Sequence, residues 1–89
     1  MKIKIMIVDD HSMVATGLAK ELDGQQDFQV TSVITSPEQV VTSLTGTASD
    51  VILMDIRMGV YNGIKMTEEI KKQYPEIKII VIQLEKKSK

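Results

Sequence analysis

Three aspartates stand directly after two short apolar segments of the sequence. Asp9 and Asp10 follow segment 3–8, and Asp55 follows segment 51–54. If the two segments are neighbouring strands, the carboxylates converge within a few ångströms, where like charges repel. A hard divalent cation with oxygen ligands relieves such a cluster, and Mg²⁺ is the natural candidate. Beside this ion, the Asp55 carboxylate is placed to attack a phosphoryl group as a nucleophile.

A simpler interpretation stays open for each of these residues taken alone. Aspartates at strand ends often cap helices or face solvent, and His11 is compatible with either role. The metal-pocket interpretation rests on the combination of two adjacent acids after one apolar segment and a third acid after another.

The acids belong to a chain in which short apolar runs alternate with helical patterns. Four runs are rich in β-branched residues and nearly continuous, as in strands that are buried on both faces: 3–8, 28–34, 51–54 and 77–82. Two stretches between them carry apolar residues four apart, which is helical spacing: Val14, Leu18 and Leu22, then Met66, Ile70 and Tyr74.

A further helix is predicted in the middle of the chain, with Ser36 as its N-cap and Pro37 at its first position. Three residues stand where the predicted helices should stop: Gly24, Gly46 and Pro75. This alternation predicts an α/β fold, a doubly wound parallel sheet with helices on both faces. Ligands bind such sheets at the carboxyl ends of the strands, where the three aspartates stand.

The composition bounds the class of protein. The chain has 89 residues, enough for one small domain, and it is 43% hydrophobic and 26% charged, with 11 basic and 12 acidic residues. The chain has no cysteine, which excludes disulfides and thiolate sites and is compatible with a cytoplasmic location. We find neither a signal-peptide pattern nor a run of membrane-spanning length. We therefore expect a cytoplasmic domain without direct nucleic-acid or membrane contacts.

Three blocks of the sequence resemble the receiver domains of response regulators, especially those joined to LuxR-type DNA-binding domains. The first block is IMIVDDH at 5–11, and the second is DVILMDIRM at 50–58 with Asn62-Gly63-Ile64. The third runs from Tyr74-Pro75 through Ile82. The blocks cover nearly the whole chain in the family's order. The resemblance implies a flavodoxin-like fold whose strand order is 2-1-3-4-5.

The resemblance also implies roles for individual residues. Asp55 would accept a phosphoryl group from a sensor histidine kinase. Asp10 and Asp55 would bind Mg²⁺ through their carboxylates, Arg57 through its backbone carbonyl, and Asp9 mostly through water. Gly63 would permit the turn into the third helix, although a glycine that serves only as a spacer is an equal alternative. Such a domain is not an enzyme beyond its own phosphorylation and dephosphorylation, and it normally controls transcription through an attached DNA-binding domain.

The sequence departs from the family's pattern in three places. Gly59 stands where the family usually has proline, and Gln83 stands at the switch position, where a Thr or Ser hydroxyl usually contacts the phosphoryl group. The resemblance ends before the last helix, strand and helix, so the lysine of the fifth strand has no counterpart. We therefore interpret 1–84 as a truncated receiver domain and 85–89 as a lysine-rich tail.

An incomplete sheet would leave segment 77–82 as an exposed, apolar edge strand. Such an edge is a template for pairing with another chain. We therefore expect a homodimer, formed through this strand or by exchange of elements.

Several alternatives remain open on the sequence alone. The chain is either a natural short protein or a fragment of a longer regulator. It is either a working phosphoacceptor or a degenerate receiver that only binds partners. A phosphatase with an aspartate nucleophile is disfavoured, because such enzymes have a second acid two residues after the nucleophile and this chain has Arg57 there.

Overall fold

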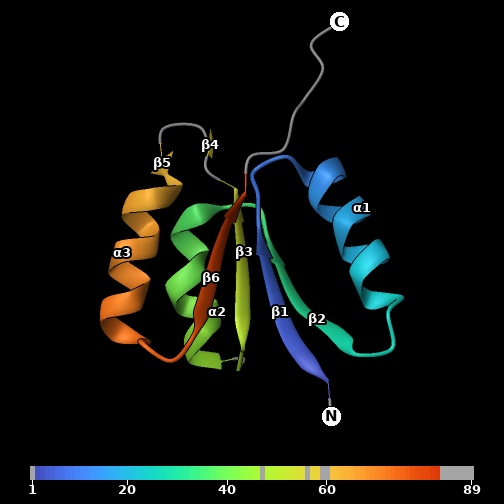
Figure 1. Ribbon diagram of the computed structural model, residues 1–89. Helices are drawn as coiled ribbons and strands as arrows, with labels where there is room; N and C mark the ends of the chain where they lie inside the picture. Colours follow the sequence, from blue (N-terminus) through green and yellow to red (C-terminus); the bar gives the residue numbers. More distant parts are fainter. Residues whose placement is uncertain (1, 47, 56, 59–60, 83–89) are drawn as a thin grey trace, which may run out of the picture.

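Four parallel strands form the sheet of this computed structural model, in the order β2-β1-β3-β6. The strands span Ile3–Val8 (β1), Phe28–Ile34 (β2), Val51–Asp55 (β3) and Lys78–Ile82 (β6). Their carboxyl ends lie at the top of Figure 1. The structure describes residues 2–46, 48–55, 57–58 and 61–82. Within these residues, the predicted strand order is confirmed.

Three α-helices of the described chain cover the two faces of the sheet. They span Ser12–Asp23 (α1), Val40–Gly46 (α2) and Gly63–Gln73 (α3). Figure 1 shows α1 on one face and both α2 and α3 on the other. The doubly wound α/β fold predicted from the alternating sequence pattern is therefore confirmed.

Each face of the sheet packs its own apolar cluster against its helices. In β1, Ile5 and Ile7 belong to the cluster beneath α1, whereas Met6 and Val8 belong to the cluster beneath α2 and α3. Successive side chains of a strand point to opposite faces, so a strand covered on both faces must be apolar at every position. This requirement explains the continuous apolar run that precedes Asp9.

Three local details differ from the sequence-based expectation. The middle helix begins with a 3-10 turn, η1 (Pro37–Gln39), before α2. Two short strands, β4 (Arg57–Met58) and β5 (Tyr61–Asn62), form an antiparallel pair that the sequence pattern did not predict. Helix α3 ends at Gln73, so Tyr74, expected as its last apolar residue, lies just beyond it.

The end of α1 at Gly24 is confirmed, but it does not depend on a positive φ. Gly24 has a φ of −74° and a ψ of −13°, in the right-handed region. Its backbone N–H donates to the Lys20 carbonyl oxygen at 3.2 Å. A residue with a side chain could adopt the same backbone conformation.

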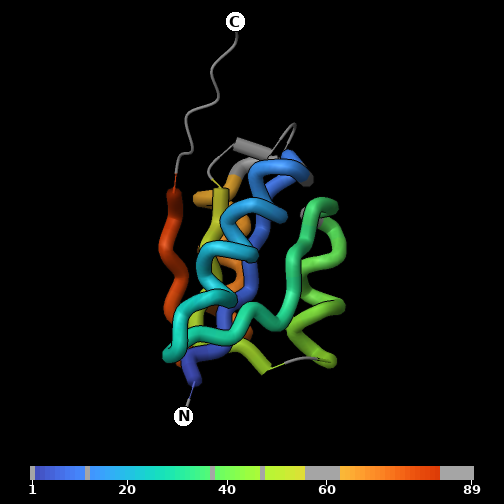
Figure 2. The backbone as a smooth tube through the Cα atoms, turned by 90° about the vertical axis from the view of Figure 1, so that its right-hand side faces the viewer, coloured from blue at the N-terminus to red at the C-terminus, as the bar shows by residue number. Residues whose placement is uncertain are grey.

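The strand β6 forms one edge of the sheet. Among the described residues it pairs with β3 alone, and Figure 2 shows it, in red, to one side of α1. Ile80 is 50% exposed and Val81 is 37% exposed. The expected edge is thus present and apolar. The lysine-rich tail 85–89 and the boundary at 84 lie outside the described residues.

Within the described residues, none of the helices combines the length and the apolar character that a membrane crossing needs.

Candidate functional site

Asp9 and Asp10 occupy the turn between β1 and α1. The backbone N–H of Asp9 donates to the Ile34 carbonyl oxygen at 3.0 Å, which ties the end of β1 to the end of β2. Asp9 is 1% exposed, and Asp10 is partly exposed. The Asp9 Oδ1 atom accepts a hydrogen bond from the backbone N–H of His11 at 2.9 Å. These contacts hold the Asp9 carboxylate in a fixed orientation at the sheet's carboxyl end.

Asp55 is the last residue of β3 and is 1% exposed. Strands β1 and β3 are neighbours, with Val8 paired to Met54, so the residue that follows each pair member lies at the same level of the sheet. Parallel pairing therefore brings Asp55 beside the turn that carries Asp9 and Asp10.

The predicted convergence of the three aspartates is confirmed by their geometry. Asp9, Asp10, His11 and Asp55 each offer one ligand atom, and these atoms all lie within 4.8 Å of one another. Carboxylate oxygens are hard ligands of the kind that Mg²⁺ prefers. The donor set therefore fits the ion that the sequence predicted.

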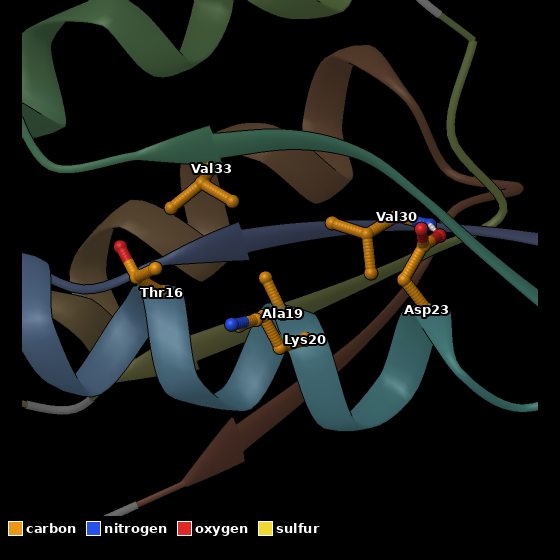
Figure 3. A pocket seen from close by; sticks show the side chains of 6 residues that line it. All are labelled: Thr16, Ala19, Lys20, Asp23, Val30 and Val33. Carbon is orange, nitrogen blue, oxygen red and sulfur yellow. Dashed lines mark hydrogen bonds between the residues drawn. The ribbon is translucent and has the colours of Figure 1, made fainter.

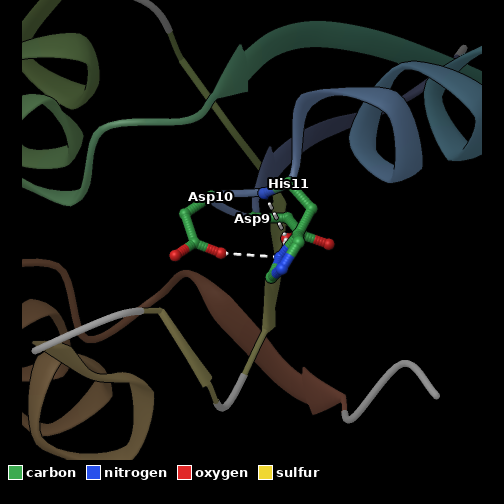
Figure 4. A network of polar contacts seen from close by, with 3 residues as sticks. All are labelled: Asp9, Asp10 and His11. Carbon is green, nitrogen blue, oxygen red and sulfur yellow. Dashed lines mark hydrogen bonds and ion pairs between the residues drawn. The ribbon is translucent and has the colours of Figure 1, made fainter. Parts of the chain in front are cut away.

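His11 belongs to this cluster, although sequence reasoning treated it only as a helix cap or a solvent-facing residue. It stands at the N-cap of α1 but makes no side-chain capping hydrogen bond. Its Nδ1 atom lies instead 2.8 Å from Asp10 Oδ1 and 3.3 Å from Asp9 Oδ1. Figure 4 shows the imidazole turned towards the two acids. The signal that could have found it is its position next to Asp10, as the one histidine of the chain.

Two predicted site residues remain, Arg57 and Gln83. Arg57 lies in β4, two positions beyond Asp55, where its backbone follows the end of β3. Gln83, the predicted switch position, lies outside the described residues, as does Gly59.

An open hollow on the α1 side of the sheet shares no residue with the acidic cluster. It has a volume of about 270 Å³, and Figure 3 shows that α1 and β2 provide its lining: Thr16, Ala19, Lys20, Asp23, Val30 and Val33. Its lining includes one carboxylate, from Asp23, and one ammonium group, from Lys20. Among the described residues, the cluster of several carboxylates lies instead at the carboxyl ends of β1 and β3.

Known proteins resemble this chain in both sequence and structure. The family model of the response regulator receiver domain matches residues 5–89. The response regulator protein VraR of Staphylococcus epidermidis is 38% identical over 82 residues, which are 92% of this chain and 39% of the relative. The chain therefore spans well under half the length of this curated relative.

Two solved structures show the same fold at lower identity. A LuxR-family two-component response regulator from Aurantimonas sp. SI85-9A1 superposes with a TM-score of 0.86 at 21% identity, covering 97% of this chain and 61% of that one. The isolated receiver domain of RcsB from Salmonella enterica serovar Typhimurium, solved with the phosphomimetic BeF₃⁻, gives a TM-score of 0.84 at 23% identity. That match covers 98% of this chain and 65% of the RcsB domain.

The acidic cluster at the carboxyl ends of β1 and β3, the strand order and the match of the family model over nearly the whole chain agree with one another. This chain belongs to the receiver domain family of two-component response regulators.

Proposed function

We propose that this chain accepts a phosphoryl group on Asp55 from a sensor histidine kinase, in a Mg²⁺-dependent reaction. The observation that carries the proposal is the placement of the Asp55 carboxylate at the end of β3, in one cluster with Asp9 and Asp10. Membership of the receiver family and the resemblance of segment 50–58 to its phosphorylation segment support it.

The proposed reaction moves one phosphoryl group from an imidazole nitrogen of the kinase to a carboxylate oxygen of Asp55. An Asp55 carboxylate oxygen attacks phosphorus, the bond between phosphorus and the donor's imidazole nitrogen breaks, and that nitrogen takes up a proton. The product on this chain is an acyl phosphate. In this proposal the chain is a cytoplasmic phosphoacceptor and not an enzyme that turns over an external substrate.

The residues around Asp55 have distinct tasks in this transfer. Asp10 and Asp55 would hold Mg²⁺ through their carboxylates, Arg57 through its backbone carbonyl, and Asp9 mostly through water. When bound there, Mg²⁺ would supply positive charge that offsets the charge of the incoming phosphoryl group. The hydrogen bond from the His11 N–H to Asp9 Oδ1 orients the Asp9 carboxylate in the cluster.

Intact mass measurement tests the proposal. The protein is incubated with acetyl phosphate and Mg²⁺, and we expect one added phosphoryl group in the unmodified chain. Asp55→Asn should abolish the addition. Asp50→Asn is the matched control, because Asp50 precedes the same strand at its opposite end and is exposed. A chain that takes up no phosphate, or takes it up equally in Asp55→Asn, contradicts the proposal and favours a degenerate receiver that only binds partners.

The output of the phosphorylated state is a further part of the proposal. We infer that phosphorylation controls transcription through a DNA-binding domain, because the chain resembles receivers of LuxR-type regulators. Reading the surrounding gene tests this inference. A helix-turn-helix encoded in the same frame is the expected result, and a frame without any DNA-binding module contradicts it.

We also propose that the chain self-associates through the edge of β6. The strand carries one charged residue, Lys78, at its start, followed by four apolar residues, Ile79–Ile82. In a two-fold antiparallel pairing centred on Ile80, that residue meets its own copy while Lys78 meets Ile82. No like charges then lie opposite one another, and the exposed Ile80 and Val81 each gain an apolar neighbour on the other copy.

Light scattering at micromolar concentration tests this pairing. The unmodified chain should have the mass of a dimer, and Ile80→Lys should shift it to a monomer by placing two ammonium groups opposite each other. Ile64→Lys is the control, since Ile64 is equally exposed but lies on α3. A monomeric unmodified chain, or a dimer that Ile80→Lys leaves intact, contradicts the proposal.

A further inference from the structure

The imidazole of His11 is directed into the acidic cluster and not towards the helix that it begins. The Nδ1 atom lies between two carboxylate oxygens, at 2.8 Å from Asp10 and 3.3 Å from Asp9. The side chain is 50% exposed, so it has room to adjust. The cluster therefore offers a nitrogen donor in addition to the oxygen donors that a magnesium site needs.

This nitrogen changes which ions the cluster can prefer. Carboxylates suit Mg²⁺, Ca²⁺ and Mn²⁺, whereas imidazole suits Zn²⁺, Cu²⁺ and Ni²⁺. Zn²⁺ is bound tetrahedrally, with ligand atoms about 2.0 to 2.2 Å from the metal and therefore roughly 3.3 to 3.6 Å from each other. The imidazole nitrogen lies in ion-pair contact with the two carboxylate oxygens, at 2.8 and 3.3 Å, and all four ligand atoms lie within 4.8 Å of one another. Small side-chain rotations would bring these atoms to the spacing of a zinc site.

We propose that His11 is a fourth metal ligand, and that together with Asp9, Asp10 and Asp55 it binds Zn²⁺ in a closed four-coordinate site. Mg²⁺ uses the oxygen donors of the same cluster and makes no use of the imidazole. The two ions therefore compete for one cluster, and His11 determines the balance between them.

The closed site has a regulatory consequence, which rests on the proposed phosphorylation of Asp55. Four-coordinate zinc sites made of four protein ligands have no open position, unlike sites that keep one for water or substrate. An Asp55 oxygen engaged as a zinc ligand is not free to attack phosphorus. Zn²⁺ thus holds the chain in a form that does not accept a phosphoryl group.

The sequence makes this proposal simple to test by binding. His11 is the one histidine of the chain, and the chain has no cysteine, so any imidazole-dependent binding has a single source in tag-free protein. Isothermal titration with ZnCl₂ and MgCl₂ at one fixed pH compares the unmodified chain with His11→Gln. We expect His11→Gln to lose at least about tenfold in Zn²⁺ affinity, since even outer-shell partners are worth about ten- to a hundredfold. Its Mg²⁺ affinity should change much less, because the imidazole contacts Asp10 and Asp9 without serving as a Mg²⁺ ligand, so the ratio of Zn²⁺ to Mg²⁺ affinity should fall.

Asp50→Asn is the matched control and should bind both ions as the unmodified chain does. Co²⁺ provides a second readout, because four-coordinate Co²⁺ absorbs visible light more strongly than six-coordinate Co²⁺. The stronger band should appear in the unmodified chain and disappear in His11→Gln. Equal Zn²⁺ affinities in the two proteins, or a weak Co²⁺ band in both, overturn the proposal.

A last experiment separates this proposal from the proposed phosphorylation. The chain is treated with acetyl phosphate and Mg²⁺ while ZnCl₂ is added in steps. We expect Zn²⁺ to suppress phosphorylation in the unmodified chain at concentrations that spare His11→Gln, with each protein compared with its own level in the absence of Zn²⁺. Equal inhibition of both proteins contradicts the regulatory step. If neither protein is phosphorylated without Zn²⁺, the proposed function fails, while the calorimetry still decides whether His11 is a zinc ligand.

Discussion

The two ends of β3 each carry an aspartate, and the sheet places them in opposite surroundings. Asp50 precedes the strand and is exposed, and its carboxylate accepts a hydrogen bond from the Lys4 backbone N–H at 2.9 Å. Its own backbone bonds to Lys4 at 2.9 Å and to Lys78 at 3.1 Å, linking β1, β3 and β6. Asp55 ends the strand, is 1% exposed and shares a cluster with two other carboxylates.

This difference shows that residue type alone does not make a site. At the amino end the aspartate joins neighbouring strands, because backbone groups there need partners. At the carboxyl end, the turns that lead from the strands to their helices bring acids from different strands together. Substitutions at the two ends should therefore change different properties of the protein.

The largest expected difference is in the free energy of unfolding that is lost when the residue next to each aspartate is truncated. Met54, which precedes Asp55, is fully buried, whereas Val51, which follows Asp50, is only partly buried. Met54→Ala should lower the free energy of unfolding by about 2 to 5 kcal/mol, because it removes buried methylenes and leaves a cavity. Val51→Ala should cost clearly less. Urea unfolding measures both, and equal losses would mean that the carboxyl end is not the better packed one.

Metal affinity should respond to acids at one end only. Asp10→Asn removes a carboxylate from the cluster and should weaken Mg²⁺ binding by about tenfold or more, the scale on which supporting groups act in metal sites. Asp50→Asn should leave Mg²⁺ binding unchanged. Calorimetric titration of both variants is the measurement, and a loss of affinity in Asp50→Asn would show that the effect is one of net charge.

A smaller effect on stability is expected at the amino end. Asp50→Ala removes the acceptor of the Lys4 N–H and should lower the free energy of unfolding by about 0.5 to 1.5 kcal/mol. Asp50→Asn keeps an oxygen acceptor and should retain most of this stability. Urea unfolding of the pair tests the assignment, which fails if both variants lose the same amount.

The smallest effect is expected at Gly17, in the helix that follows the acidic turn. A Cβ added there meets no atom within 4 Å, so Gly17→Ala fits without strain. It should raise the free energy of unfolding by about 0.5 to 1 kcal/mol through the higher helix propensity of alanine. Thermal unfolding measures the gain. Mg²⁺ affinity should not change, and a change would indicate that stability and the cluster are coupled.

The sequence predicted the sheet well because burial on both faces leaves a strong signal. The strand β1 must be apolar at every position, and the predicted bounds 3–8 coincide with those of the structure. The convergence of Asp9, Asp10 and Asp55 followed from strand order alone. Both predictions depend on the order of strands and helices, and the spacing of apolar residues indicates that order.

The features that the sequence missed depend on side-chain direction or on very short elements. Strands β4 and β5 have two residues each, too few to show any periodicity. The turn between β1 and α1 sets the orientation of His11. Because His11 stands at the N-cap of α1, the sequence was equally compatible with a capping side chain. Its contact with Asp10 became visible only in three dimensions.

The most direct test of the phosphoacceptor assignment asks which of the clustered acids carries the phosphoryl group. Borohydride reduces the acyl phosphate of an aspartate to homoserine, and peptide mass spectrometry then locates the converted residue. After treatment with acetyl phosphate and Mg²⁺, we predict conversion at Asp55, with Asp9, Asp10 and Asp50 unchanged. Conversion at one of the acids after β1, or no conversion at any residue, would contradict the account.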